Sequence, residues 1–167
     1  MRIPKFFRKR ADLLFENAKL LVPAAHASAV TMFVPMLDRF PALESVDPKH
    51  WDFILTVAAV FLAATRLSGS RIGSVREEKL MEIVAQQLNV WDADGILAFE
   101  DCKTFFEIEF DRLSSTQHPQ EFVAVDALGL WIVWNAMERQ PDVQKDMILV
   151  RTVGTIVVNG FFNWWKT

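Results

Sequence analysis

Three segments of this chain are apolar on nearly every side, and they constrain the fold more than any other feature. They run through residues 51–62, 122–137 and 143–165, and Pro48 and Pro119 mark the starts of the first two. A helix without a polar face is stable only where other elements surround it. We therefore expect these segments to be the innermost helices of an all-α protein.

The N-terminal half of the chain predicts three further helical boundaries. Apolar pairs recur every seven residues over residues 5–21, which indicates an amphipathic helix that Pro23 should end. A second helix is expected over residues 25–40, bent or broken at Pro35. The order Asp47-Pro48 is typical of an N-cap followed by a first-turn proline.

Two helices are expected in the middle of the chain. Ser74 and Glu77 have the spacing of a capping box, and Gly95 indicates the turn that follows this helix. Residues 106–111 alternate with period two, as a strand would, within a segment whose neighbours have helical periodicity. We interpret this segment as helical because no partner strand is apparent.

The length and composition predict a single domain over residues 1–167. The chain has 167 residues, of which 51% are hydrophobic, and no linker rich in glycine, serine or proline divides it. The expected architecture is an antiparallel bundle or irregular array of about seven helices. Residues 1–22 would form a basic amphipathic helix that lies at the edge of the core or on it.

The N-terminus is the strongest candidate for a contact surface. Five of the first ten residues are basic, while the rest of the chain has 13 basic and 21 acidic residues, a difference of −8. A basic amphipathic helix can bind a groove on a partner protein, an anionic membrane surface or the acidic body of its own chain. A nucleic-acid partner is not expected, because such proteins have a broader basic face. The candidate contact residues are Arg2, Lys5, Phe6, Phe7, Arg8, Lys9 and Arg10.

Asp126 and Arg151 stand alone as charges within otherwise apolar segments. A buried charge is usually paired, and an antiparallel arrangement of the last two helices would bring these residues within reach of each other. We expect a structural ion pair. Exposure of one or both residues, or a place in a functional cleft, would also fit the sequence.

The segment around Asp92, Asp94 and Asp101 resembles a calcium loop in spacing but supplies too few oxygen ligands, because Val90 occupies the first position. A polar connection between helices is the preferred interpretation, and this loop is only a weak candidate for a metal. His26, His50 and His118 share no spacing with enough other ligands to form a zinc site, so we expect capping or surface roles for them. No metal or other cofactor is predicted.

Residues Phe61, Arg66, Ser70, Ser74, Glu77, Glu78 and Leu80 follow an order that is similar to small tellurite-resistance TerB-type helical bundles. In both, an apolar helix is followed by a short polar connector and an acidic helix start. The Asp-Gly turn typical of that family is not in this connector, where Arg66 and Gly69 stand instead. The resemblance implies a helical bundle, and no metal-binding residue of the family is carried over.

The function expected from the sequence is a non-catalytic protein-interaction domain: an adaptor, a regulator or a subunit of a complex. None of the common catalytic motifs occurs, although catalytic groups assemble in space and a small enzyme would also fit the sequence. A peripheral membrane protein fits it as well, and so does a binder of a small apolar ligand held between the inner helices. A single cysteine, Cys102, favours a cytoplasmic location, with membrane association as the second choice. A homo-oligomer is compatible with so apolar a chain.

Overall fold

The computed structural model describes residues 5–68, 74–162 and 164, and the side chains of residues 5–12, 67, 68 and 74 lie outside that description. Within the described residues the protein is all-α, as predicted, with no strand, and residues 106–111 are helical. The helices are α1 (Lys5–Ala29), α2 (Phe33–Arg39), α3 (Pro48–Ser68), α4 (Ser74–Trp91), α5 (Gly95–Ser114), α6 (Val123–Met137) and α7 (Met147–Phe161), with two short 3-10 helices, η1 (Pro41–Leu43) and η2 (Gln120–Phe122).

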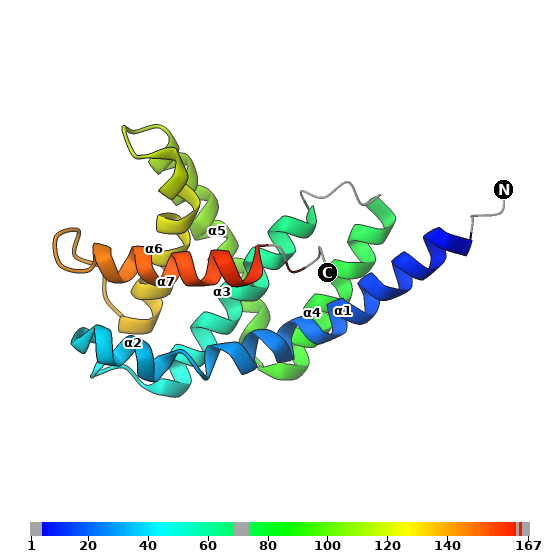
Figure 1. Ribbon diagram of the computed structural model, residues 1–167, viewed down its shortest axis with the longest axis horizontal. Helices are drawn as coiled ribbons and strands as arrows, with labels where there is room; N and C mark the ends of the chain where they lie inside the picture. The colour runs from blue at the N-terminus through cyan, green and yellow to red at the C-terminus, as the bar shows by residue number, and fades with distance from the viewer. Residues whose placement is uncertain (1–4, 69–73, 163, 165–167) are drawn as a thin grey trace.

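Helix α3 lies at the centre of an irregular array rather than a parallel-sided bundle. It contacts α1, α4, α5, α6 and α7, and Figure 1 shows α1 and α4 on one side of it and α6 and α7 on the other. From Trp51 to Ala64, all but two residues of α3 are buried. This agrees with the prediction that an all-apolar helix is internal.

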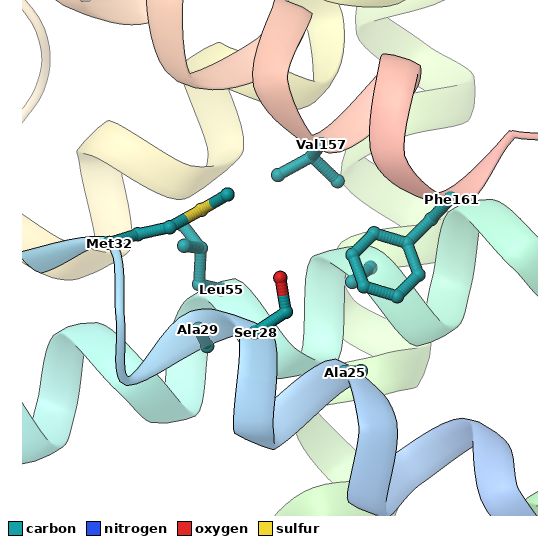
Figure 2. Close-up of a pocket in the computed structure, with 8 residues that line it drawn as sticks. Ala25, Ser28, Ala29, Met32, Leu55, Val157 and Phe161 are labelled. Carbon is teal, nitrogen blue, oxygen red and sulfur yellow. The ribbon is translucent and has the colours of Figure 1, made fainter.

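The C-terminal half of α1 passes beside α7, and both pack against α3. Figure 2 shows Ala25 and Ser28 of α1 facing Val157 and Phe161 of α7 across a small opening. Helix α7 buries one face here but leaves Ile148 exposed on the other. The prediction that α7 is as internal as α3 was therefore wrong, because α7 crosses the outside of the array.

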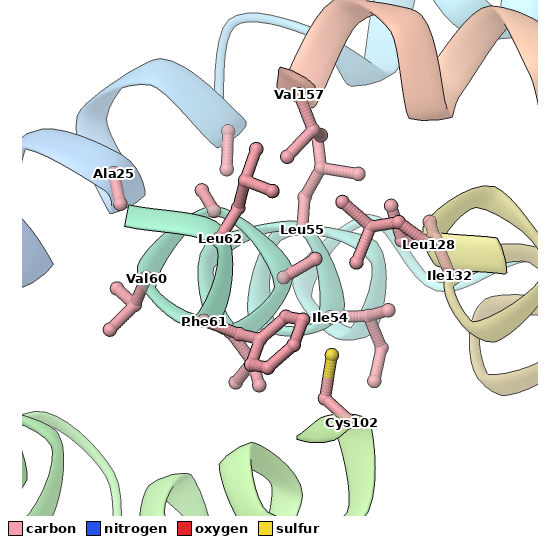
Figure 3. Close-up of a cluster of buried hydrophobic side chains, with 14 of the residues drawn as sticks. Ala25, Ile54, Leu55, Val60, Phe61, Leu62, Cys102, Leu128, Ile132 and Val157 are labelled. Atoms are coloured by element: carbon pink, nitrogen blue, oxygen red, sulfur yellow. The ribbon is translucent and has the colours of Figure 1, made fainter. Parts of the chain in front are cut away.

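The main core is a cluster of apolar side chains around α3, and a smaller cluster of Leu113, Val123 and Ala127 joins α5 to α6. Figure 3 looks along α3 and shows Leu128 and Ile132 of α6, Cys102 of α5 and Val157 of α7 gathered around it. Phe61 of α3 points toward α5, where its ring meets Phe99 and Phe106 edge-on. Each helix thus contributes its inward face to a shared interior.

Helices α6 and α7 cross at close range because each has a glycine at the contact. A Cβ atom built at Gly129 would lie 2.1 Å from the carbonyl oxygen of Val150, and one at Gly154 would lie 2.1 Å from that of Val125. No side chain fits in that space, so glycine is required by the close approach and not by its backbone conformation. The crossing fixes which residues of the two helices lie opposite each other.

The predicted end of the first helix at Pro23 was wrong, since α1 continues through this residue to Ala29. Proline removes one backbone hydrogen bond from the helix. The residues on either side compensate by burying Leu21, Val22 and Ala25 in the core. The break falls at residues 30–32 instead, and Pro35 lies in the first turn of α2, where its nitrogen has no intrahelical partner to lose.

Three other predicted boundaries were displaced by local hydrogen bonds. Gly95 is the first residue of α5, after a turn at Asp92–Asp94 in which the Asp92 carboxylate accepts the Asp94 N–H (2.9 Å). The sixth helix begins at Val123 after η2, not at Pro119, and the seventh begins at Met147, not at residue 143. The Asp146 carboxylate accepts the Asp142 N–H, the Asp142 carboxylate accepts the N–H groups of Gln144 and Lys145, and these bonds hold the last segment as a turn.

Candidate functional site

The predicted N-terminal contact residues lie at the start of α1. Arg2 is outside the described residues, and Lys5, Phe6, Phe7, Arg8, Lys9 and Arg10 form the first turns of α1, with side chains that the structure does not describe. The part of the same helix whose side chains are placed begins at Leu13. This part shows which apolar residues of α1 are buried and which are exposed.

The apolar pairs of α1 divide between two faces of the helix. Leu21 is fully buried and Leu14 is half-buried, whereas Leu13 and Leu20 are 62% and 58% exposed. Residues seven apart lie on nearly the same helical face, so Leu13, Leu20 and the exposed Ala27 form one outward line. We name Leu13, Leu20 and Ala27 the outer row. Sequence periodicity indicates the Leu13/Leu14 and Leu20/Leu21 pairs but does not show that the second leucine of each is the one that faces the core.

A charged pair interrupts the outer row. Glu16 lies between Leu13 and Leu20 and is bound to Lys19 (Oε1–Nζ 2.9 Å), with both side chains exposed. Among the described residues, the helical stretch Leu13–Arg39 is long and apolar enough to cross a membrane by length and composition, and 33% of its most apolar window is buried inside the protein. The core helix of a soluble protein can have the same length and composition.

Asp126 is the centre of a buried charge cluster. Its fully buried carboxylate accepts hydrogen bonds from Arg151 Nε (3.0 Å, to Oδ1) and Arg151 Nη2 (2.5 Å, to Oδ2). The structure thus contains the Asp126–Arg151 ion pair that the sequence predicts. Two parallel N–H···O bonds give a guanidinium–carboxylate pair both strength and a fixed orientation.

His118 is a third member of this cluster, and the sequence interpretation missed it. His118 Nε2 lies 2.8 Å from Asp126 Oδ2, while the Arg151 guanidinium carbon stacks 4.0 Å from the centre of the Phe122 ring. The predicted role of His118 as a helix cap or surface residue was wrong. Its spacing from Asp126, eight residues along the chain, gave no signal because the intervening residues form a turn and η2, not a regular helix.

The geometry of this cluster indicates a structural role. It joins the connection after α5 to α6 and α7, and the hydrogen bonds that Arg151 donates to Asp126 raise the pKa of the guanidinium, which stays charged. The hydroxyls that precede His118 most closely in the chain, those of Ser115 and Thr116, donate to backbone carbonyls at 2.9 and 2.8 Å. A hydroxyl bound in this way is not activated as a nucleophile, because a carbonyl is not a base that accepts its proton.

The aspartates of the weak candidate metal loop have separate structural roles. Asp92 caps the α4–α5 turn, whereas Asp101 lies on α5 and accepts the indole N–H of the buried Trp131 (2.8 Å). The described residues contain no group of three or more histidine, cysteine, aspartate or glutamate side chains that could hold a metal ion. Asp101 therefore serves to satisfy a buried tryptophan of α6.

The apolar pocket between α1, α3 and α7 is too small for an organic ligand. Its volume is about 10 Å³, and the hydroxyl of Ser28 points into it (Figure 2). Sites for small molecules have volumes of about 300–1,000 Å³.

Comparison with known proteins gives no assignment: no family model, no curated protein and no solved structure matches this chain. The similarity of residues 61–80 to TerB-type bundles thus gains no support, and the geometry of the described residues is the basis for a functional proposal.

Proposed function

We propose that this protein is a non-catalytic interaction domain, an adaptor, regulator or subunit, that binds a partner protein through the outer row of α1. The observation that carries the proposal is the exposure of Leu13 and Leu20 beside a buried Leu21 in the same helix. An exposed apolar line with a polar border is typical of a surface that receives an amphipathic partner helix.

The Glu16–Lys19 pair favours a protein partner over the interior of a bilayer. A protein can offer a counter-charge or a hydrogen bond to Glu16, whose carboxylate is exposed between the two leucines. Hydrocarbon offers neither, and burying a charged group without a partner is unfavourable by several kcal/mol. Deeper insertion of α1 would also remove the buried Leu21 and Val22 from the core that α1 forms with α3 and α4.

The test compares the double variant Leu13→Gln/Leu20→Gln with the matched control Val75→Gln/Val90→Gln. Val75 and Val90 are strongly exposed apolar residues of a different helix, α4. We expect a protein partner captured by the full chain, and reconstituted with it as a stoichiometric complex, to be lost from the first variant and kept by the control. A complex that survives in both variants would contradict the proposal.

A peripheral membrane protein is the second candidate, because Arg2, Lys5, Arg8, Lys9 and Arg10 precede the outer row directly. A single helix would then combine charge attraction with shallow insertion of leucines. Co-sedimentation with vesicles of anionic and of neutral lipids distinguishes this candidate. Binding to anionic vesicles that salt weakens, and that the Leu13→Gln/Leu20→Gln variant loses, would place the membrane ahead of a protein partner.

A further inference from the structure

A surface cleft of about 350 Å³ lies between the start of α3 and the end of α6, away from the outer row and from the Asp126 cluster. Its polar lining comes from Ser45, Asp47, His50 and Glu138. Val46 and Ala136 are buried and provide an apolar base. This volume is within the range of sites that bind small organic molecules.

The walls of the cleft are held in place by the ends of two helices. His50 Nε2 lies 2.9 Å from the carbonyl oxygen of Asn135, one of the last carbonyls of α6, which have no intrahelical partner. Because a carbonyl only accepts, Nε2 carries the proton of this bond. After Met137 the chain reverses at Glu138, whose backbone is left-handed (φ 51°, ψ 30°). The bond from His50 fixes the distance between the two walls.

The cleft carries negative charge without a lining cation among the residues that the structure describes. Asp47 and Glu138 contribute carboxylates, and the lining includes neither lysine nor arginine. Arg139, next to Glu138 in the chain, is bound to Asp146 through both terminal nitrogens (2.7 and 3.2 Å). Oδ1 of Asp47 accepts the Lys49 N–H (2.9 Å) and caps α3. That bond neutralises neither carboxylate of the cleft.

The field of Asp47 extends into the adjacent turn of α3. The pKa of Asp52 is raised, mainly because burial disfavours its charged form; the nearby His26 opposes this shift, and the negative charge of Asp47 adds to it. A negative potential that is not neutralised locally attracts a cation. The cleft thus combines acceptor groups, negative charge and enough volume for several non-hydrogen atoms.

We propose that this cleft binds a small organic cation, an alkylammonium or alkylguanidinium group. Such a ligand would donate hydrogen bonds to Asp47 and Glu138 while its alkyl part packs on Val46 and Ala136. A bare metal ion does not fit, because the cleft is much larger than an ion and the described residues bring no three metal-ligating side chains together. This proposal is independent of the outer row.

The test is an NMR titration of the ¹⁵N-labelled full chain with butylammonium, with agmatine and with the neutral analogue butanol. We expect saturable shifts with both cations, confined to residues 45–50 and 135–139, and at least about tenfold weaker binding of butanol. No saturable shift with either cation, or equal binding of butanol, would overturn the proposal.

The variants Asp47→Asn and Glu138→Gln remove the charges and keep the shapes, and Asn still caps a helix well. Each should weaken butylammonium binding at least about fivefold. The control variant Glu100→Gln/Asp111→Asn removes two charges from the exposed side of α5 and should bind as the wild type does. Equal weakening by the control would mean that only the net charge matters, and would overturn a specific site.

Discussion

The α6–α7 crossing and the outer row of α1 both contain apolar residues, but those at the crossing are buried and those of the outer row are exposed. At the crossing, the backbones approach until only glycine fits, and ten residues of α6 are buried. Along α1, Leu13 and Leu20 are as hydrophobic as the buried apolar residues of α6 but remain in contact with solvent. The difference teaches that hydrophobic content alone does not distinguish an interior from a binding surface. What distinguishes them is whether a second element in the same chain covers the residue.

The largest effect should come from closing the space at the crossing. Gly129→Ala or Gly154→Ala places a methyl group against a backbone carbonyl that cannot rotate away, so the two helices must separate. We expect the free energy of unfolding in urea to fall by more than about 3 kcal/mol, at or above the upper end for overpacked cores. Gly160→Ala is the matched control: its Cβ would meet nothing within 4 Å. It should be neutral or stabilising by up to about 1 kcal/mol. Equal losses at all three glycines would show that the close approach is not the cause.

The next prediction concerns two neighbouring leucines of α1. Leu21→Ala removes a fully buried side chain and should lower the free energy of unfolding by about 3 kcal/mol, from lost burial and the cavity left behind. Leu20→Ala removes an exposed one and should change it by less than about 0.5 kcal/mol. If both leucines proved equally important for the stability of the isolated protein, the outer row would be covered in solution, and self-association should be measured by analytical ultracentrifugation.

A smaller loss of stability is expected when the charge of Arg151 is removed. Arg151→Met retains the packing on Phe122 but leaves the buried Asp126 carboxylate with His118 as its remaining side-chain partner among the described residues. Removing one member of a buried pair usually lowers stability by about 3–5 kcal/mol. Because the Arg151 side chain is 40% exposed, we expect about 2 kcal/mol in urea unfolding. The variant Arg112→Met, which breaks the exposed pair with Glu109, should lose less than about 1 kcal/mol.

The smallest effect should appear as a dependence on pH. Hydrogen bonds from Arg139 lower the pKa of Asp146 from its ordinary value of 3.8, so the ionised form stabilises the fold. This contribution is fully present above the ordinary pKa and is lost as the pH falls through the lower pKa of the folded state. Asp146→Asn should therefore be less stable than the wild type by about 1 kcal/mol at pH 7, and the gap should shrink below about pH 4. A gap that stayed constant down to about pH 2 would contradict the role of ionisation.

The all-α class, the start of α3 at Pro48 and the Asp126–Arg151 pair follow from local rules that the sequence displays. Apolar periodicity, a proline after an N-cap residue and the high energy of an unpaired buried charge each involve few residues. The continuation of α1 through Pro23 does not follow, because packing against α3 outweighs the local effect of proline.

The candidate surfaces could not be predicted from the sequence, because they too depend on how distant segments pack together. Whether Leu20 or Leu21 faces the core depends on where α3 and α4 lie, and periodicity permits either choice. The cleft beside His50 joins residues that are 85 positions apart in the chain, so no local pattern marks it. His118 meets Asp126 through a turn whose path depends on hydrogen bonds that the residue types do not specify.

The position of Cys102 makes its thiol a natural probe for the opening of the contact between α3 and α5. It is fully buried between α3 and α5 (Figure 3), and burial, with a smaller contribution from Asp101, raises its pKa well above the ordinary value. An alkylating reagent reacts with the thiolate, so the folded chain must open at this contact before it can be labelled. The ratio of the labelling rate in the native protein to that in urea gives the equilibrium constant for that opening, without any engineered probe. Cys102 therefore allows the population of the open α3–α5 contact to be measured without a mutation.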